Sequence, residues 1–153
     1  MASKLISKEN SPTIRHFQGD GITRILEAIV DFSKITTALV AQNEVAEAID
    51  IPANCRVNHV RAEVLTVEGA ARNFAIGDGA STSGYITTQS ANALAEFHTT
   101  LLLTEAAPNT VTGYTNGKYY ATADTIDILA VTAGGLTTCR IKVSAEITQY
   151  LGA

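Results

Sequence analysis

The chain has 153 residues, of which 46% are hydrophobic and 17% are charged, and its formal net charge at pH 7 is −4. This length suits one domain that buries about two-thirds of the surface of its unfolded chain. The acidic balance, with no lysine or arginine between residues 73 and 117, argues against a nucleic-acid partner, which needs clustered cations. No run approaches the ~18 apolar residues of a membrane-spanning helix, so we expect no membrane contact.

Residues 1–21 differ from the rest of the chain because they are polar, contain Pro12 and follow no strand or helix period. They also lack the apolar core of a secretory signal, so we expect folding in a reducing cytoplasm. We interpret residues 1–21 as an extended N-terminal arm and residues 22–153 as the folded domain. The alternative is a disordered terminus without a role. The cations of the arm are candidates for contact with a negatively charged partner: Lys4, Lys8 and Arg15.

The first part of the domain is ambiguous, because between residues 22 and 44 the spacing of apolar residues suits either a strand or a helix. We favour a strand over residues 25–32, while the alanine and glutamate content of residues 37–48 also suits a helix. Residues 45–51 then predict a strand that stops at a proline, and residues 56–68 predict a long strand. One face of that long strand is expected to carry Val60, Ala62, Val64 and Thr66.

The remainder reads as short strands separated by glycine, proline and asparagine turns. The strands are expected over residues 73–76, 85–88, 98–104, 118–121, 124–132 and 137–150. Asn116-Gly117 is the strongest hairpin signal, since both residue types accept positive φ, and Gly134-Gly135 predicts another turn. The closing strand alternates without interruption, with small or apolar residues in one phase: Cys139, Ile141, Val143, Ala145 and Ile147. About eight such strands predict an all-β fold, a single β-sandwich or barrel.

The sequence offers no constellation for catalysis or metal binding. His16, His59 and His98 lack the close spacing of metal ligands. The triplet at residues 77–79, Gly-Asp-Gly, most simply makes a turn in which the aspartate bonds its own backbone. Asp124 and Asp127 are three apart on a strand, which puts them on opposite faces. With no paired nucleophile and base, we expect no catalytic residues, no metal, no cofactor and no enzymatic activity.

The cysteines and tyrosines lead to two further expectations. Cys55 and Cys139 are too few for a disulfide framework, so we expect buried free thiols. Tyrosines on loop tips bind sugars or proteins, because they offer contact area at low entropic cost. Tyr85, Tyr114 and Tyr120 are our candidates for such contacts. The plainer alternative is that Tyr119 and Tyr120 alternate in and out of a strand.

Four segments, in this order, resemble small structural proteins of tailed bacteriophages. They are the turn at residues 51–54 before a long strand, residues 74–79 with Gly84-Tyr85, residues 117–127, and the hairpin at Gly134-Gly135 with the closing strand. The resemblance covers roughly residues 44–150. It implies a jelly-roll-like sandwich, often a trimer, that decorates or cements the capsid.

From this resemblance we expect a decoration (cement) protein on the capsid exterior, made in the host cytoplasm and stabilising the head at capsomer junctions. Its partners would be the major capsid protein and itself, as a homotrimer, with the arm ordering against neighbouring subunits. One alternative is a carbohydrate-binding or host-attachment module, which needs a tyrosine cluster at one end of the sandwich. Another is a tail-tube or neck component that assembles into rings.

Overall fold

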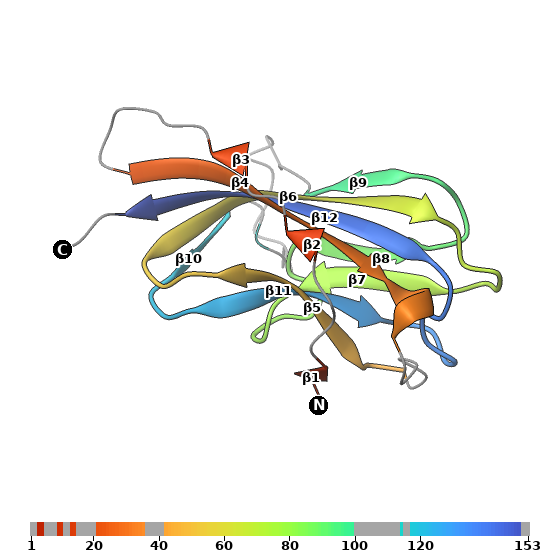
Figure 1. The fold of residues 1–153 in the computed structure, drawn as a ribbon. Helices are drawn as coiled ribbons and strands as arrows, with labels where there is room; N and C mark the ends of the chain where they lie inside the picture. The colour runs from red at the N-terminus through yellow and green to blue at the C-terminus, as the bar shows by residue number, and fades with distance from the viewer. Residues whose placement is uncertain are drawn as a thin grey trace, which may run out of the picture.

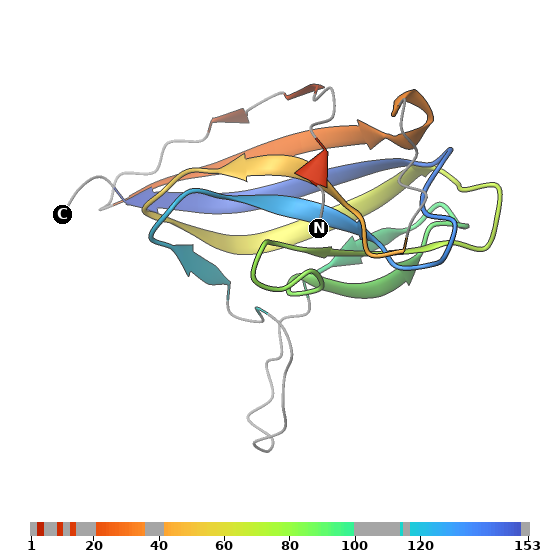
Figure 2. The same cartoon turned by 90° about the horizontal axis from the view of Figure 1, so that it is seen from below.

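The computed structural model describes residues 21–35, 42–99, 114 and 117–150, and the backbone alone of residues 3–4, 9–10 and 13–14. Figures 1 and 2 show two layers of strands packed face to face, so the prediction of an all-β sandwich is confirmed. The strands are β1 (Ser3–Lys4), β2 (Glu9–Asn10), β3 (Thr13–Ile14), β4 (Gly21–Asp31), β5 (Val45–Ile51), β6 (Cys55–Thr66), β7 (Asn73–Gly77), β8 (Ile86–Ser90), β9 (Glu96–His98), β10 (Lys118–Tyr120), β11 (Asp124–Ala130) and β12 (Arg140–Tyr150). No helix in this described part could span a membrane.

The chain passes repeatedly between the two layers. One sheet has the order β1-β5-β11-β7-β8, and the other has the order β10-β6-β12-β4-β2, with β3 also on β4 and β9 also on β6. All pairings are antiparallel except that of β1 with β5. Each long strand therefore depends on partners that are distant in the sequence, which is typical of sandwiches.

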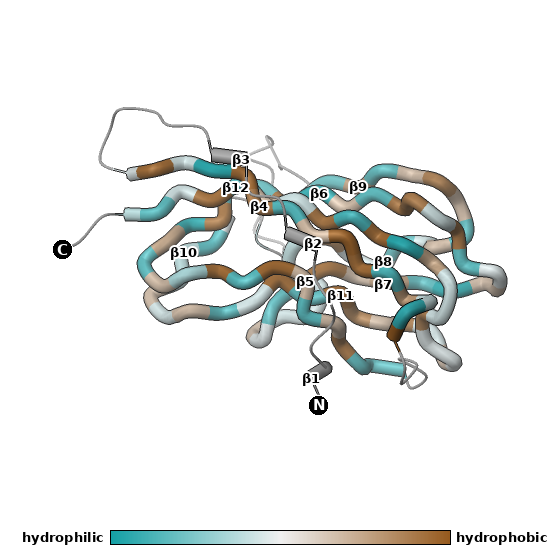
Figure 3. Tube along the Cα trace, viewed as in Figure 1, coloured by the Kyte–Doolittle hydropathy of each residue, from teal (hydrophilic) through white to brown (hydrophobic). Residues whose placement is uncertain are grey.

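The closing strand β12 lies at the centre of the larger sheet. It pairs along its whole length with β4, from Arg140 opposite Asp31 to Tyr150 opposite Gly21, and on its other side with β6. The alternation predicted for it is confirmed, because its apolar phase is fully buried: Cys139, Ile141, Val143, Ala145 and Ile147. Figure 3 shows the alternation of apolar and polar residues along the strands that surround this core.

Strand β6 changes phase twice. His59 lies opposite Glu146 and Val57 opposite Ile147, so Asn58 is an extra residue, and both Val57 and Val60 point into the core. A second irregularity near Leu65 reverses the phase again. The prediction that Thr66 shares the buried face of Val60 is therefore wrong: Thr66 lies opposite Arg140 and is exposed.

The ambiguous region resolves into strands where the structure describes it. The strand predicted over residues 25–32 is confirmed as β4, which begins earlier, at Gly21, and is followed by a 3-10 turn at Phe32–Lys34. Strand β5 has the predicted bounds. The helical alternative for residues 37–48 does not form over residues 42–48, and residues 36–41 lie outside the described part.

In the second half, the bounds of one predicted strand need correction, and the structure describes the glycines of the two predicted turns. The strand expected over residues 98–104 is β9, which ends at His98, and residues 100–104 lie outside the described part. Gly117 has the positive φ expected of a turn, and its N–H bonds Tyr114 O at 3.0 Å. The following strand β10 pairs with β6, and the residues that would form the other arm of a hairpin, 111–113, 115 and 116, lie outside the described part. The turn at Gly134-Gly135 is confirmed by two positive φ values.

The described pieces of the N-terminal arm run beside the sandwich. β1 pairs with β5 at the edge of the smaller sheet, and both β2 and β3 pair with β4 at the edge of the larger one. Lys4 belongs to β1, while Lys8 and Arg15 lie outside the described residues. The boundary between arm and domain at residue 21 stays a prediction.

Both cysteines are buried and free, as expected. Cys55 lies opposite Gln149 near one end of β12, whereas Cys139 directly precedes the other end. Ten residues of strand separate these positions by roughly 33 Å, far beyond the ~7 Å limit for the Cα atoms of a disulfide. A bond between the two thiols is therefore excluded in the folded chain.

Glu68 fixes the segment that leads into β12. Its side chain is only 4% exposed. Its carboxylate accepts hydrogen bonds from the backbone N–H groups of Thr137, Thr138 and Cys139 at 2.8, 3.0 and 3.2 Å, and from both threonine hydroxyls. Burial opposes ionisation, but these donors outweigh it and lower the pKa of Glu68 to about 2.

Replacing Glu68 by glutamine is expected to lower the free energy of unfolding by about 3 kcal/mol at pH 7, because buried N–H groups lose a charged acceptor. The pKa of the folded state lies below the ordinary 4.5, so this contribution is present above pH 4.5 and is lost as the pH falls towards 2. Urea denaturation at pH 7 and pH 3 measures both effects. The control is Glu63→Gln on the outer face of β6, which should lower the free energy of unfolding by less than ~1 kcal/mol. Equal losses in the two variants would contradict the role assigned to Glu68.

Candidate functional site

The loop after β7 is closed by Asp78. Its Oδ1 accepts hydrogen bonds from Ala80 N at 2.9 Å and Ser81 N at 2.8 Å, so the turn predicted at Gly-Asp-Gly is confirmed. Gly77 is required beside it, since a Cβ there would lie 2.0 Å from Ser81 O. Asp78 itself has no exposed surface. A buried carboxylate of this kind needs more partners than its own turn provides.

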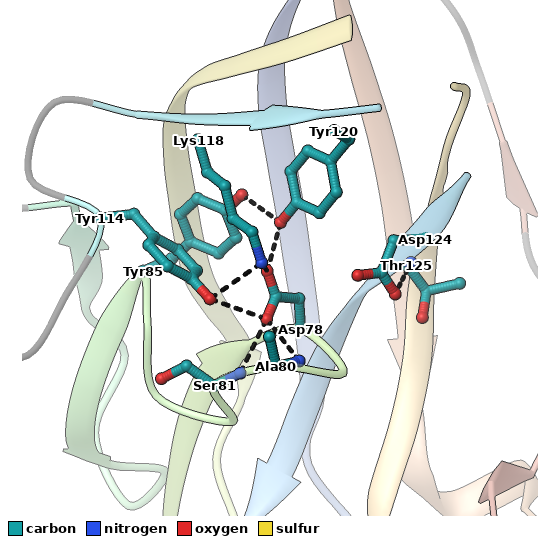
Figure 4. Close-up of polar contacts among 9 residues, drawn as sticks. All are labelled: Asp78, Ala80, Ser81, Tyr85, Tyr114, Lys118, Tyr120, Asp124 and Thr125. Atoms are coloured by element: carbon teal, nitrogen blue, oxygen red, sulfur yellow. Dashed lines mark hydrogen bonds and ion pairs between the residues drawn. The ribbon is translucent and has the colours of Figure 1, made fainter. Parts of the chain in front are cut away.

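Those partners come from residues 114–120, far along the chain (Figure 4). Lys118 Nζ lies 2.6 Å from Asp78 Oδ2, and the hydroxyl of Tyr114 donates to Asp78 Oδ1 at 3.0 Å. The hydroxyl of Tyr120 donates to Asp78 Oδ2, and the hydroxyls of Tyr120 and Tyr85 lie 2.6 Å apart. We call these five residues the Asp78 cluster.

The Asp78 cluster is an ion pair enclosed by phenols. Burial opposes ionisation of Asp78, but hydrogen bonds from Lys118 and Tyr120 lower its pKa below the usual range. Burial also opposes the charge of Lys118, yet its bond to Asp78 raises its pKa. Burial raises the pKa of Tyr85 and Tyr120 far above that of free tyrosine. The charges therefore stay fixed around neutral pH, and the arrangement holds two segments together rather than moving protons.

The structure brings the three predicted contact tyrosines together, but in a different role. Tyr85 and Tyr120 are each only 4% exposed, so the prediction that they present their rings at loop tips is wrong. The Tyr120 hydroxyl bonds the buried carboxylate of Asp78, and the Tyr85 hydroxyl bonds that of Tyr120, which outweighs the advantage of solvent exposure. Tyr114 is half-buried. The alternative prediction, that Tyr119 and Tyr120 alternate in and out of a strand, is confirmed for β10: Tyr119 points outward and Tyr120 inward.

Sequence reasoning missed Asp78 and Lys118 as partners. The available signal was the spacing of Lys118 and Tyr120, which puts an ammonium and a phenol on the same face of one strand. A charged residue in the buried phase needs a counter-ion, and the Gly-Asp-Gly turn contains an acid whose only expected partner was its own backbone. Nothing local to either segment indicates that the two meet.

Tyr120→Phe is expected to lower the free energy of unfolding by about 1.5–3 kcal/mol, because a hydrogen bond to a buried carboxylate is lost. The adjacent Tyr119→Phe changes an exposed hydroxyl bonded to Asn54 and should cost less than ~0.5 kcal/mol. Denaturant unfolding of the two variants makes a matched comparison. Equal stability of both variants would show that the bond between Tyr120 and Asp78 contributes nothing to stability.

Asp124 and Asp127 point to opposite faces of β11, as predicted. The neighbours of Asp124 in its phase, Ile126 and Ile128, are in the core, whereas Asp127 lies on the outer face opposite Glu47. Asp127 is 5% exposed, and its Oδ1 lacks a hydrogen-bond partner in the described part of the chain. Burial raises the pKa of Asp127 to about 6; a hydrogen bond from Thr125 opposes this shift, and the charge of Glu47 adds a smaller increase.

Asp127→Asn should stabilise the protein at pH 8 by up to about 3 kcal/mol, because it removes a buried carboxylate. The folded pKa lies above the ordinary 3.8, so the stability of the native chain is full below pH 3.8 and decreases as the pH rises through about 6. The advantage of the variant should therefore vanish near pH 4. Unfolding between pH 4 and 8 measures it, with Asp124→Asn as control; an advantage independent of pH would contradict the proposed origin.

The structure also places two exposed features that the sequence did not reveal. The rings of His59 and His98 are 5.6 Å apart on the outer face of the larger sheet, although the two residues share no motif in the sequence. His16 lies outside the described part. Within the described residues, no group of three or more His, Cys, Asp or Glu side chains could hold a metal ion. The rings of Tyr119 and Tyr150, 51% and 42% exposed, lie 6.1 Å apart at one end of the sandwich.

No family model and no curated protein sequence matches the chain. Three solved bacteriophage structures contain chains of similar fold. The chain of a structure described as "Cyanophage Pam1 capsid asymmetric unit" has a TM-score of 0.63 at 14% identity, and the alignment covers 90% of this chain and 91% of that one. For "Capsid of Ralstonia phage GP4" the TM-score is 0.60 at 10% identity, with 92% of each chain covered.

The third is described as "Acidic stable capsid structure of Helicobacter pylori bacteriophage KHP30" and has a TM-score of 0.53 at 11% identity, with 93% of each chain covered. In all three cases the alignment extends over nearly the whole of both chains, so the likeness concerns the complete sandwich. At these identities it shows a common fold. The chain therefore shares its fold with chains found in the capsids of three phages.

Proposed function

We propose that this chain is a non-enzymatic structural component of a bacteriophage virion, and specifically a decoration (cement) protein. It binds the outer capsid surface, where it contacts the major capsid protein and stabilises the head at capsomer junctions. The observation that carries this proposal is the fold shared with chains of three phage capsids over at least 90% of this chain. Synthesis in the host cytoplasm before attachment to the exterior belongs to the same proposal.

The chemistry of the described residues supports a structural role. The strongest polar cluster, around Asp78, is buried and internally satisfied, and it leaves no open position for a substrate. The outer face of the larger sheet is a ladder of cross-strand polar pairs. These include Lys142–Glu27 at 3.0 Å, Arg140–Asp31 at 3.6 Å and Thr23–Thr148 at 3.0 Å. Such cross-strand pairs stiffen a surface without offering a reactive group.

The arm supports attachment to neighbouring subunits. Its described pieces add short strands to sheet edges through backbone pairing, a mode of contact that any extended segment can use. Lys4, Lys8 and Arg15 would supply charge complementarity to an acidic capsid surface. Association as a homotrimer would cover further sheet edges and bring three arms to one capsid junction.

A carbohydrate-binding or host-attachment module is the second candidate, and one observation favours it. Tyr119 and Tyr150 form an exposed aromatic pair at one end of the sandwich, next to the side-chain amide of Asn54. This is the arrangement that such a module requires, although with different tyrosines from those predicted. Loss of binding to a polysaccharide panel on Tyr119→Ala would identify this function.

The primary proposal predicts saturable binding to phage heads. Purified protein should have the mass of a trimer by mass photometry and should co-sediment with heads that lack it, raising the temperature at which they open. Replacing the three arm cations by glutamate should weaken binding at 50 mM salt more than at 500 mM, because salt screens the arm's charges. The circular dichroism spectrum of this variant should match that of the unaltered protein, which shows that the sandwich still folds. Failure of the unaltered trimer to bind any head would overturn the proposal.

A further inference from the structure

Strand β9 fixes the chain to β6 immediately before residue 100. Its three residues pair with β6 in the register Glu96 opposite Glu63, Phe97 opposite Ala62, and His98 opposite Arg61. The next residue, Thr99, is buried, and both its N–H and its hydroxyl bond Val60 O, at 2.9 and 3.0 Å. These contacts fix the backbone of the chain at Thr99.

The outer face of this attachment carries two histidines among charged groups. His59 and His98 have ring centroids 5.6 Å apart, and His98 Nε2 lies 2.6 Å from Glu96 Oε1. Glu96 also pairs with Arg61, which lies 3.8 Å from Glu63. The charged groups around the pair come from three strands: Arg61 and Glu63 of β6, Glu96 of β9, and Glu146 of β12. Strand β8, which also packs against β9, has no titratable side chain.

We propose that the contact between His59 and His98 is a proton-sensitive clasp, which holds β9 on β6 at neutral pH and weakens when mild acid charges the ring of His59. The geometry supports this coupling, because a positive charge on His59 is repelled by His98, whose ring lies 5.6 Å away, and by Arg61 nearby. The single carboxylate of Glu96 is already shared between Arg61 and His98. Detachment of β9 separates the rings and relieves the repulsion.

The electrostatic setting of His59 gives the direction of the effect. Burial, and next the charges of His98 and Arg61, lowers the pKa of His59 below its ordinary 6.5, against an opposing contribution from Glu146. A lowered folded pKa means that the detached state binds the proton more tightly. The contribution of His59 to the attachment of β9 is therefore complete above pH 6.5 and is lost as the pH falls below this value.

Strand β10 provides an internal control on the same edge of β6. It pairs with Cys55–Val57 through Lys118–Tyr120, and the Asp78 cluster holds it there. The shifts described above keep the pKa values of Asp78, Lys118 and Tyr120 outside the interval between pH 5.5 and 7.5. Mild acid should therefore loosen β9 and leave β10 attached.

Amide hydrogen exchange, followed by NMR at pH 7.5 and 5.5 and corrected for intrinsic exchange rates, tests the clasp on the full chain. Protection of the Thr99 amide should fall about two- to fivefold at pH 5.5, the range expected for a partly exposed charge pair, while that of Tyr120 stays constant. In a pH titration of the same protein followed by NMR, the imidazole signals of His59 should change below pH 6.5.

His59→Gln and His98→Gln should each abolish the fall at Thr99. Loss of ring packing alone would lower protection equally at both pH values, so the change with pH isolates the charge effect. Lys142→Gln, which removes a cation from the same sheet face, should leave the fall unaltered. The proposal is overturned if protection of Thr99 does not depend on pH in the native chain, or if it falls equally in His59→Gln.

Discussion

The pairing of β12 with β4 on one side and β6 on the other is the constraint on which the rest of the structure depends. Every residue of β12 has a partner on β4, and nearly every residue has one on β6, so its register sets the register of both. A slip of one residue would turn its buried phase outward along the whole strand. Glu68 counters such a slip at the start, because three consecutive backbone N–H groups before Arg140 bond to its carboxylate.

The buried acids of the molecule differ because their partners differ. Glu68 and Asp78 are both enclosed, and each is stabilised as a carboxylate by several donors. Asp127 is equally enclosed but faces Glu47, and one of its oxygens has no hydrogen-bond partner among the described residues, so the effect of burial on its pKa dominates. Mild acid therefore relieves one strained site while the two carboxylates that fasten loops keep their charge. The molecule can respond to pH at its surfaces without losing the bonds that set its registers.

How far the sequence predicts the structure depends on whether the cause is local. The alternation in β12 is uninterrupted, so its buried face follows from residue spacing alone. In β6 the same reasoning fails at Thr66, because bulges are defined by the partner strand and not by β6 itself. The Gly-Asp-Gly turn was predictable, since Asp78 bonds its own loop. Its bonds to Lys118 and Tyr120 span some forty residues and depend on the completed fold.

The covered edges of the larger sheet limit how this molecule can contact a partner. Along the outer edge of β6, residues 55–57 are occupied by β10, Val60 by Thr99, residues 61–63 by β9, and Val64 by Ala95. At the opposite edge, β4 is paired at four positions by β2 and β3. Short edge strands of this kind prevent extension of the sheet into a neighbour. Attachment through the edges of the larger sheet would therefore require displacement of these short strands, whereas side chains on the faces and ends of the sandwich need no such change.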